Sequence, residues 1–274
     1  MWTVTSGTQA LHRATAGPWP ERLARLGLAA RGVLYLVIGV LALQVAFGRR
    51  DEEASQTGAL QEVASQPFGR VLIWVVAVGL VGYALWRLLT ALLGTRADPT
   101  ATGMKERVKA LAEGIGYGSV AVLAIRIALG SGSRSSGGGS KQAATVLSWT
   151  GGQFLVGAAG VAIAGIGVYF IVEGWRADFT KELNLGRVGP TARKVVIQLG
   201  RVGRIARGAA FVLIGVLVVV AAVTYDPSKA QGLDGALRTL AQQPYGTWLL
   251  VLVALGLIAY GVYGLAESRL RRVG

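Results

Sequence analysis

A few glutamates and arginines at the borders of long apolar runs are the side chains of this sequence most able to do chemistry. They are Glu113, Glu173, Arg31, Arg87 and Arg207. Ionisable groups are costly to bury in lipid, so those beside a membrane are candidates for function. We expect the two glutamates to pair with these arginines at the inner surface and to lock neighbouring helices together. The plain alternative is that all five are separately solvated at helix ends.

Side chains for catalysis or metal binding are scarce. The chain has no cysteine, and its single histidine, His12, lies in a polar N-terminal tail. This composition excludes disulfides and thiolate metal sites, and it leaves no histidine for a catalytic triad inside a membrane. We therefore expect no catalytic residue, no metal, no cofactor and no enzymatic activity. The stretch Gly130–Lys141 lacks the spacing of a phosphate-binding loop, and its composition is typical of a flexible linker.

Six apolar runs are the elements that would position the charged residues. Of the 274 residues, 53% are hydrophobic and 15% are charged, whereas soluble domains carry about 25% charged residues. Each run is continuous rather than alternating, and each can cross a hydrocarbon core of about 30 Å as a helix. The predicted fold is an all-α, polytopic membrane bundle. The runs cover 28–47, 70–93, 108–130, 153–175, 204–224 and 246–266.

The distribution of lysine and arginine predicts how the bundle is oriented. Most of them flank the first run, follow the second and fourth runs, or end the chain. Basic residues are enriched on the cytoplasmic side of membranes, so both termini are predicted to be cytoplasmic. The net charge of +14 is explained by these helix ends and does not indicate nucleic acid. The expected partner is the bilayer, with anionic lipids of the inner leaflet. A basic amphipathic stretch over 193–206 is expected to lie on that leaflet.

A short motif occurs twice outside the apolar runs. Gly58-Ala-Leu leads to Gln-Pro-Phe-Gly69, and Gly235-Ala-Leu leads to Gln-Pro-Tyr-Gly246. In each copy the residues before the proline have apolar positions at helical spacing, and a proline ends a helix. We expect short helices against the outer surface, with a structural turn as the main role of the motif. The residues of the turn are Pro67, Phe68, Gly69, Pro244, Tyr245 and Gly246.

Glycines recur at matched positions of three two-helix units. Small residues let helix backbones approach closely in a membrane, so a packing role is expected for them. Because each unit crosses twice, successive units enter the membrane in the same direction, as parallel repeats around a pseudo-threefold axis. The matched glycines are Gly32, Gly118 and Gly208 in the first helices and Gly79, Gly165 and Gly256 in the second helices.

The segments Arg25–Tyr35 and Gly58–Arg70, together with Gly82–Arg87, resemble the bacterial membrane repeat called "domain of unknown function 1206". Three copies would cover nearly the whole chain, with the middle copy degenerate. The resemblance implies a multi-pass bacterial membrane protein, and it implies no activity or ligand. We expect the protein in the plasma membrane. The expected parts are a cytoplasmic tail over 1–21, repeats over 22–94, 105–178 and 191–268, and a basic tail over 269–274.

Two functions fit this organisation. The first is a non-enzymatic scaffold or accessory subunit of a membrane complex, and a protein partner is possible. The alternative is a channel or carrier for a small or lipidic molecule along the pseudo-threefold axis. A continuous polar cavity on that axis would favour transport, whereas a closed core of small apolar residues would favour a structural role.

Overall fold

Six long helices make up most of the structure, a computed structural model that describes residues 19–48, 55–65, 69–94, 103–130, 138–230 and 232–271. All six are long and apolar enough to cross a membrane. They confirm the expected all-α membrane bundle. The helices are α2 (Trp19–Ala46), α4 (Gly69–Leu93), α5 (Met104–Ala128), α7 (Gly152–Arg176), α8 (Pro190–Thr224) and α10 (Gly246–Leu270).

Three short helices each precede the second long helix of a unit. They are α3 (Gln56–Ser65), α6 (Gly138–Leu147) and α9 (Leu233–Ala241). Helices α3 and α9 fall where the repeated motif predicts them. Helix α6 corrects the expectation of a flexible linker over Gly130–Lys141, because residues 138–141 form its first turn. Residues 131–137 lie outside the described ranges.

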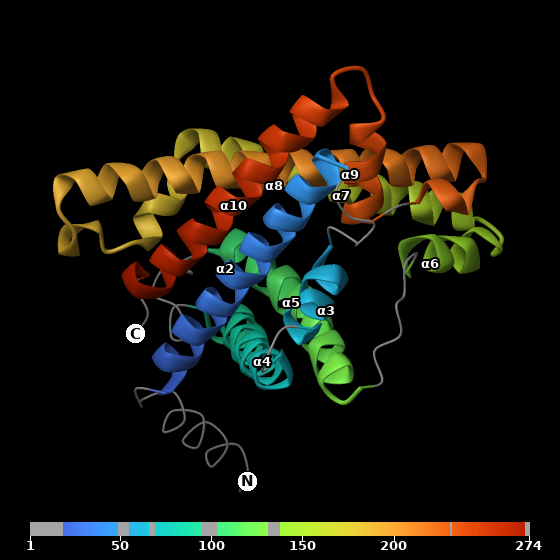
Figure 1. The fold of residues 1–274 in the computed structure, drawn as a ribbon. Coiled ribbons are helices and arrows are strands. Elements are labelled where there is room, and N and C mark those ends of the chain that lie inside the picture. The colour runs from blue at the N-terminus through green and yellow to red at the C-terminus, as the bar shows by residue number, and fades with distance from the viewer. Residues whose placement is uncertain are drawn as a thin grey trace, which may run out of the picture.

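The six long helices pack as three pairs, and each pair joins two different repeats (Figure 1). Helix α2 lies beside α10, α4 beside α5, and α7 beside α8. The second helix of each repeat thus packs most extensively against the first helix of the next repeat. In the same way, α10 of repeat three packs against α2 of repeat one. Packing between the two helices of one repeat is less extensive.

Matched glycines form two of the three seams between repeats. A Cβ atom at Gly32 would lie 2.8 Å from the carbonyl oxygen of Gly261 on α10, and one at Gly208 would lie 2.6 Å from the carbonyl oxygen of Gly167 on α7. Real Cβ atoms do not come that close, so only glycine permits these approaches. At the third seam the matched glycine is less closely packed, because a Cβ at Gly118 would lie 3.8 Å from the Ala84 Cβ.

The contact inside a repeat is present in repeats one and three but absent in repeat two. A Cβ at Gly79 would lie 2.8 Å from the Ala30 Cβ, and one at Gly256 would overlap the Ala206 Cβ. The matched glycine of repeat two behaves differently, because a Cβ at Gly165 would meet no described atom within 4 Å. The expectation that Gly165 packs against a neighbouring helix is therefore corrected.

A glutamate explains why repeat two is open. In repeats one and three the first helix carries Gly27 or Gly203, and a Cβ there would strike the backbone of Tyr83 or Tyr260 on the second helix. Glu113 stands at the matched position of repeat two. Its side chain prevents the same close approach, and α5 and α7 pack little against each other.

The motif turns connect each short helix to a long one at the end of the bundle away from the start of α2. Gly69 and Gly246 begin α4 and α10 so close to the last carbonyl groups of α3 and α9 that neither position has room for a Cβ. Tyr245 has a positive φ of 60° and is 83% exposed, so its ring lies outside the bundle. Pro244 precedes it in the turn, whereas Pro67 and Phe68 lie outside the described residues.

The start of α2 and the end of α10 lie at one end of the molecule, where the Arg25 guanidinium donates to the Arg269 carbonyl oxygen at 3.0 Å. Helix α8 also corrects an expectation at this end. The amphipathic stretch over 193–206 continues without a break into the membrane span, so it is not a separate surface helix.

Candidate functional site

A buried network of ion pairs occupies the end of the bundle where α2 begins and α10 ends. Arg31 on α2 donates to Glu267 on α10 at 2.6 Å and to the Tyr83 hydroxyl on α4 at 2.8 Å. The Arg31 and Glu267 side chains are 3% and 1% exposed. A paired and hydrogen-bonded charge is tolerated in such a place, whereas a single unpaired one is costly.

The network continues from Glu267 to the segment after α7. Arg271 donates to Glu267 at 2.6 Å and lies 3.0 Å from Glu182 in the short 3-10 turn Asp178–Glu182. Glu182 lies outside the spanning helices. Burial alone would raise the pKa of its carboxyl, but Arg271 and Lys109 outweigh burial and lower that pKa to about 2. Glu182 therefore stays ionised at neutral pH.

Glu173 joins repeats two and three within the same network. Its two carboxylate oxygens lie 2.7 Å from the Lys109 ammonium on α5 and 2.7 Å from the Arg204 guanidinium on α8. The sequence suggested Arg31, Arg87 or Arg207 as its partner. The structure instead brings it to Arg204, which lies about one helical turn before Arg207 on α8.

Glu113 has the kind of partner that the sequence suggested. Its carboxylate lies 2.7 Å from the Arg87 guanidinium and accepts a hydrogen bond from the Tyr83 hydroxyl at 2.8 Å. Tyr83 also accepts from Arg87 at 3.1 Å. Through Tyr83 this group of residues is connected to Arg31, so charges from repeats one and two share one hydrogen-bonded system.

Arg207 is the predicted cation that stands apart from the carboxylates. It donates to the Tyr260 hydroxyl at 2.6 Å, and within the described ranges no carboxylate lies within 4.0 Å of it. Its side chain is 6% exposed, and among the described residues its Nε has no hydrogen-bond partner. Aromatic rings surround its guanidinium carbon, the nearest being Phe170 with a ring centre 4.3 Å away.

Sequence reasoning missed several members of the network: Glu267, Arg271, Glu182, Lys109 and Arg204. Glu267 falls one position beyond the sixth apolar run, where an acidic residue reads as an ordinary solvated helix end. One available signal was the matched Arg–Tyr pairs. Arg31 with Tyr83 and Arg207 with Tyr260 recur in repeats one and three, and such pairs mark the buried polar face of each unit.

A cavity of about 210 Å³ lies beside Arg207. Repeats one and three supply its described walls, and α5 and α7 contribute no residue to them. The cavity extends from Arg207 to the beginnings of the short helices α3 and α9. Its lining residues are Tyr35, Ser55, Thr57, Arg207, Ala210, Phe211, Ile214, Leu233 and Leu257.

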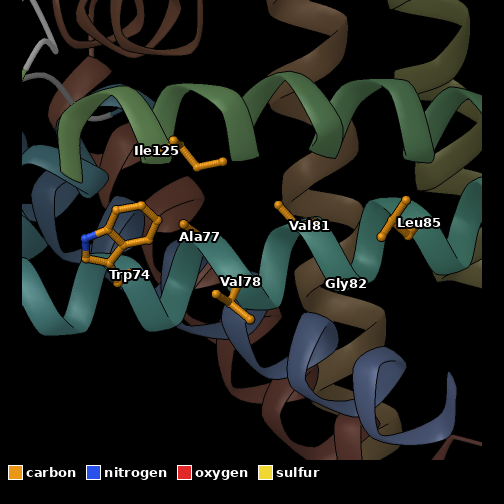
Figure 2. Close-up of a pocket in the computed structure, with 7 residues that line it drawn as sticks. All are labelled: Trp74, Ala77, Val78, Val81, Gly82, Leu85 and Ile125. Carbon is orange, nitrogen blue, oxygen red and sulfur yellow. The ribbon is translucent and has the colours of Figure 1, made fainter. Parts of the chain in front are cut away.

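A second hollow is an apolar groove along the α4–α5 seam (Figure 2). Figure 2 shows Trp74, Val81 and Leu85 of α4 on the side that faces α5, where Ile125 comes from the other helix. Trp74 and Leu85 are 40% and 50% exposed. Apolar side chains with this exposure on a spanning helix contact lipid tails, so the groove is explained by the bilayer.

The described charges can hold the repeats together. In these parts of the chain, no three His, Cys, Asp or Glu side chains are grouped so that they could hold a metal ion. The carboxylates of the network instead face arginine or lysine, and those cations neutralise them.

Comparisons with known proteins agree with this architecture. The model of the family described as Domain of Unknown Function (DUF1206) matches the chain three times, at residues 26–94, 108–177 and 202–271. The chain is 36% identical over 254 residues to the "Uncharacterized protein YxxB" of Bacillus subtilis (strain 168), covering 92% of this chain and 91% of the relative. No solved structure matches the chain significantly.

Proposed function

The chain belongs to the family of the Domain of Unknown Function (DUF1206), and we propose that it acts as a non-enzymatic scaffold or accessory subunit of a membrane complex. The observation that supports this proposal is the ion-pair network. It fastens α2, α4, α5, α7, α8 and α10 to one another at a single end of the bundle.

A network of this kind favours one fixed conformation of the bundle over the alternation between conformations that a carrier needs. A carrier exposes its site to each side in turn, so it must open both ends of the bundle. Opening this end would separate Arg31 from Glu267 and Arg204 from Glu173, each of which is almost fully buried. Removing the partner of a buried charge costs about 3–5 kcal/mol, and such a cost per pair disfavours opening.

The proposal includes a place in the cell. We assign the protein to the bacterial plasma membrane, with both termini in the cytoplasm and anionic lipids beside the basic helix ends. The excess of basic residues at the network end supports this orientation. A reporter that is active only in the cytoplasm, fused after Gly274, is expected to be active. A reporter that works only outside the cell, fused at the same place, is expected to be inactive, and its activity would refute the orientation.

Native mass spectrometry of the protein extracted from its own membrane in nanodiscs tests the scaffold proposal. We expect a discrete complex in which this chain and a defined partner occur in a fixed ratio. Glu173→Gln should loosen that complex, whereas the exposed substitution Asp178→Asn should leave it intact. A chain that is always alone, in membranes where it catalyses solute flux, would refute the proposal.

A carrier of small or lipidic molecules is the second candidate, and the cavity beside Arg207 favours it. The cavity is partly polar, and its described walls come from α2, α8, α10 and the beginnings of α3 and α9. Flux assays in proteoliposomes distinguish the two functions. Saturable uptake of an anion that disappears in Arg207→Gln would support a carrier, and the scaffold proposal expects no uptake above that of protein-free liposomes.

A further inference from the structure

Among the described residues, Arg207 is a buried cation without the counter-charge that its repeat-matched residue has. Arg31, at the same position of repeat one, donates to Glu267 across the α2–α10 seam. The residue of α7 that matches Glu267 is Arg176, which is exposed. At the α7–α8 seam, repeat three therefore supplies the arginine, but repeat two supplies no glutamate at the matched position of α7. Arg207 nevertheless is 6% exposed in the bundle.

The neighbours of Arg207 satisfy only part of its hydrogen-bonding capacity. A guanidinium has five N–H donors. From the part of the chain that the structure describes, Arg207 has one hydrogen bond, to the Tyr260 hydroxyl, and its buried Nε finds no acceptor. The faces of Phe170 and Phe211 stabilise the positive charge, but ring faces do not replace a carboxylate as acceptors.

The cavity beside Arg207 has room for a ligand that accepts hydrogen bonds from its guanidinium. Arg207 forms part of its wall, and Tyr35, Ser55 and Thr57 supply hydroxyl groups there. The remaining lining is apolar or aromatic. Its volume of about 210 Å³ corresponds to roughly seven groups of the size of a water molecule. A site of this size and lining suits a small amphipathic molecule with one negative charge.

We propose that this cavity binds a monocarboxylate with an apolar chain, with its carboxylate on Arg207 and its chain against Phe211, Ile214 and Leu257. The planar guanidinium matches a carboxylate with two parallel hydrogen bonds. Phosphate fits less well, because a single arginine cannot neutralise both negative charges of the dianion. The walls are also mainly apolar. The site does not depend on the scaffold proposal, since an accessory subunit and a carrier could both use it.

The acid could arrive from water or from the membrane, and equilibrium binding distinguishes these sources. The full chain, in nanodiscs of zwitterionic lipid, is dialysed against radiolabelled hexanoate or loaded with radiolabelled palmitate. We expect saturable binding of one molecule per chain for at least one of them. Tighter binding of hexanoate identifies a soluble acid, and tighter binding of palmitate identifies a fatty acid of the membrane. Hexanol and inorganic phosphate are expected to compete at least tenfold more weakly than hexanoate.

Two variants connect binding to this cavity. Arg207→Gln removes the anchor and should weaken carboxylate binding at least tenfold. Leu233→Phe keeps the charge but narrows the cavity, and it should also weaken binding. Arg176→Gln removes an exposed cation and serves as the control with unchanged binding. Thermal unfolding of each variant verifies that it is folded.

Three results would overturn the proposal. One is the absence of saturable binding for both acids. Another is binding that is as tight in folded Arg207→Gln as in the unaltered chain. The third is hexanol competing as well as hexanoate, because the charge would then contribute nothing. None of these results bears on a protein partner, so the scaffold proposal would stand or fall separately.

Discussion

Arg31 and Arg207 show that matched residues can have different energetic roles. Both lie on the first helix of a repeat, and both donate to a tyrosine on the second helix. Arg31 also has a buried carboxylate partner, whereas Arg207 has aromatic rings and a cavity beside it. A buried cation with a carboxylate partner helps to hold the folded bundle together. A buried cation without one lowers the stability of the fold, and a bound anion can offset that loss.

Replacing the two arginines with a residue of similar length tests this difference. Arg31→Met should lower the free energy of unfolding by about 3 kcal/mol, because Glu267 loses one of its partners in a buried place. Arg207→Met should change it by less than about 1 kcal/mol or raise it. Thermal unfolding in one detergent measures both. A loss for Arg207→Met as large as for Arg31→Met would show that the fold requires this cation.

Glu173 should be among the residues most sensitive to neutralisation. Glu173→Gln leaves Lys109 and Arg204 without a carboxylate between them, and a loss of about 3 kcal/mol is expected. Asp178→Asn is the control, because Asp178 pairs with Lys181 on the surface and such pairs contribute about 0.5 kcal/mol. Unchanged unfolding of Glu173→Gln in detergent would contradict a structural role for the network.

The pKa of Glu182 predicts how stability depends on pH. Its carboxyl has a pKa of about 2 in the folded protein, below its ordinary value of about 4.3. The ion pair with Arg271 therefore contributes fully above the ordinary pKa and is lost as the pH falls toward 2. The free energy of unfolding, measured from pH 7 to pH 3, should decline below about pH 5. This decline should be smaller in Glu182→Gln. Identical pH profiles would contradict the assignment.

Sequence reasoning found the ionisable residues of the site better than it found their partners. A glutamate beside an apolar run is visible as a costly residue, which is why Glu113 and Glu173 were identified. The choice of partner depends on which seam each helix face enters, and that depends on packing across repeats. Glu182 illustrates this limit, since it lies in a polar loop and only tertiary contacts bring it to Arg271.

Helix packing divides the three repeats into two closed units and one open unit. In repeats one and three, glycine on the first helix lets a tyrosine-bearing second helix approach. Repeat two has Glu113 there, and its second helix packs against α8 instead. The sequence predicted a degenerate middle copy but expected its matched glycines to pack like the others, because matched glycines are visible in a sequence and the absence of a facing helix is not.

Alanine at matched glycines tests the open unit. A Cβ at Gly203 would come within 2.6 Å of the Tyr260 backbone, whereas one at Gly165 would meet nothing within 4 Å. Gly203→Ala should therefore lower the unfolding temperature clearly. Gly165→Ala should preserve or raise it, because alanine favours a helix by up to about 1 kcal/mol over glycine. Equal destabilisation by both changes would mean that α5 and α7 pack together after all.

The whole molecule combines a fastened end with a cavity that reaches toward the other end. Ion pairs among all three repeats hold the first end. Short helices with fully buried leucines, Leu60 and Leu237, cover the other end. The number and length of the spans were predictable from hydropathy, since lipid requires helices of that length. The closing pair of α2 and α10 could not be read from hydropathy, because it joins the two ends of the chain.

The central claim is that this bundle keeps one shape, and spin-label distances test it most directly. The chain has no cysteine, so Lys105→Cys and Arg269→Cys place one label on repeat two and one on repeat three at the fastened end. In liposomes, double electron–electron resonance should give one narrow distance distribution that hexanoate does not change. Two populations whose ratio shifts with hexanoate would contradict the claim and would show an alternating carrier.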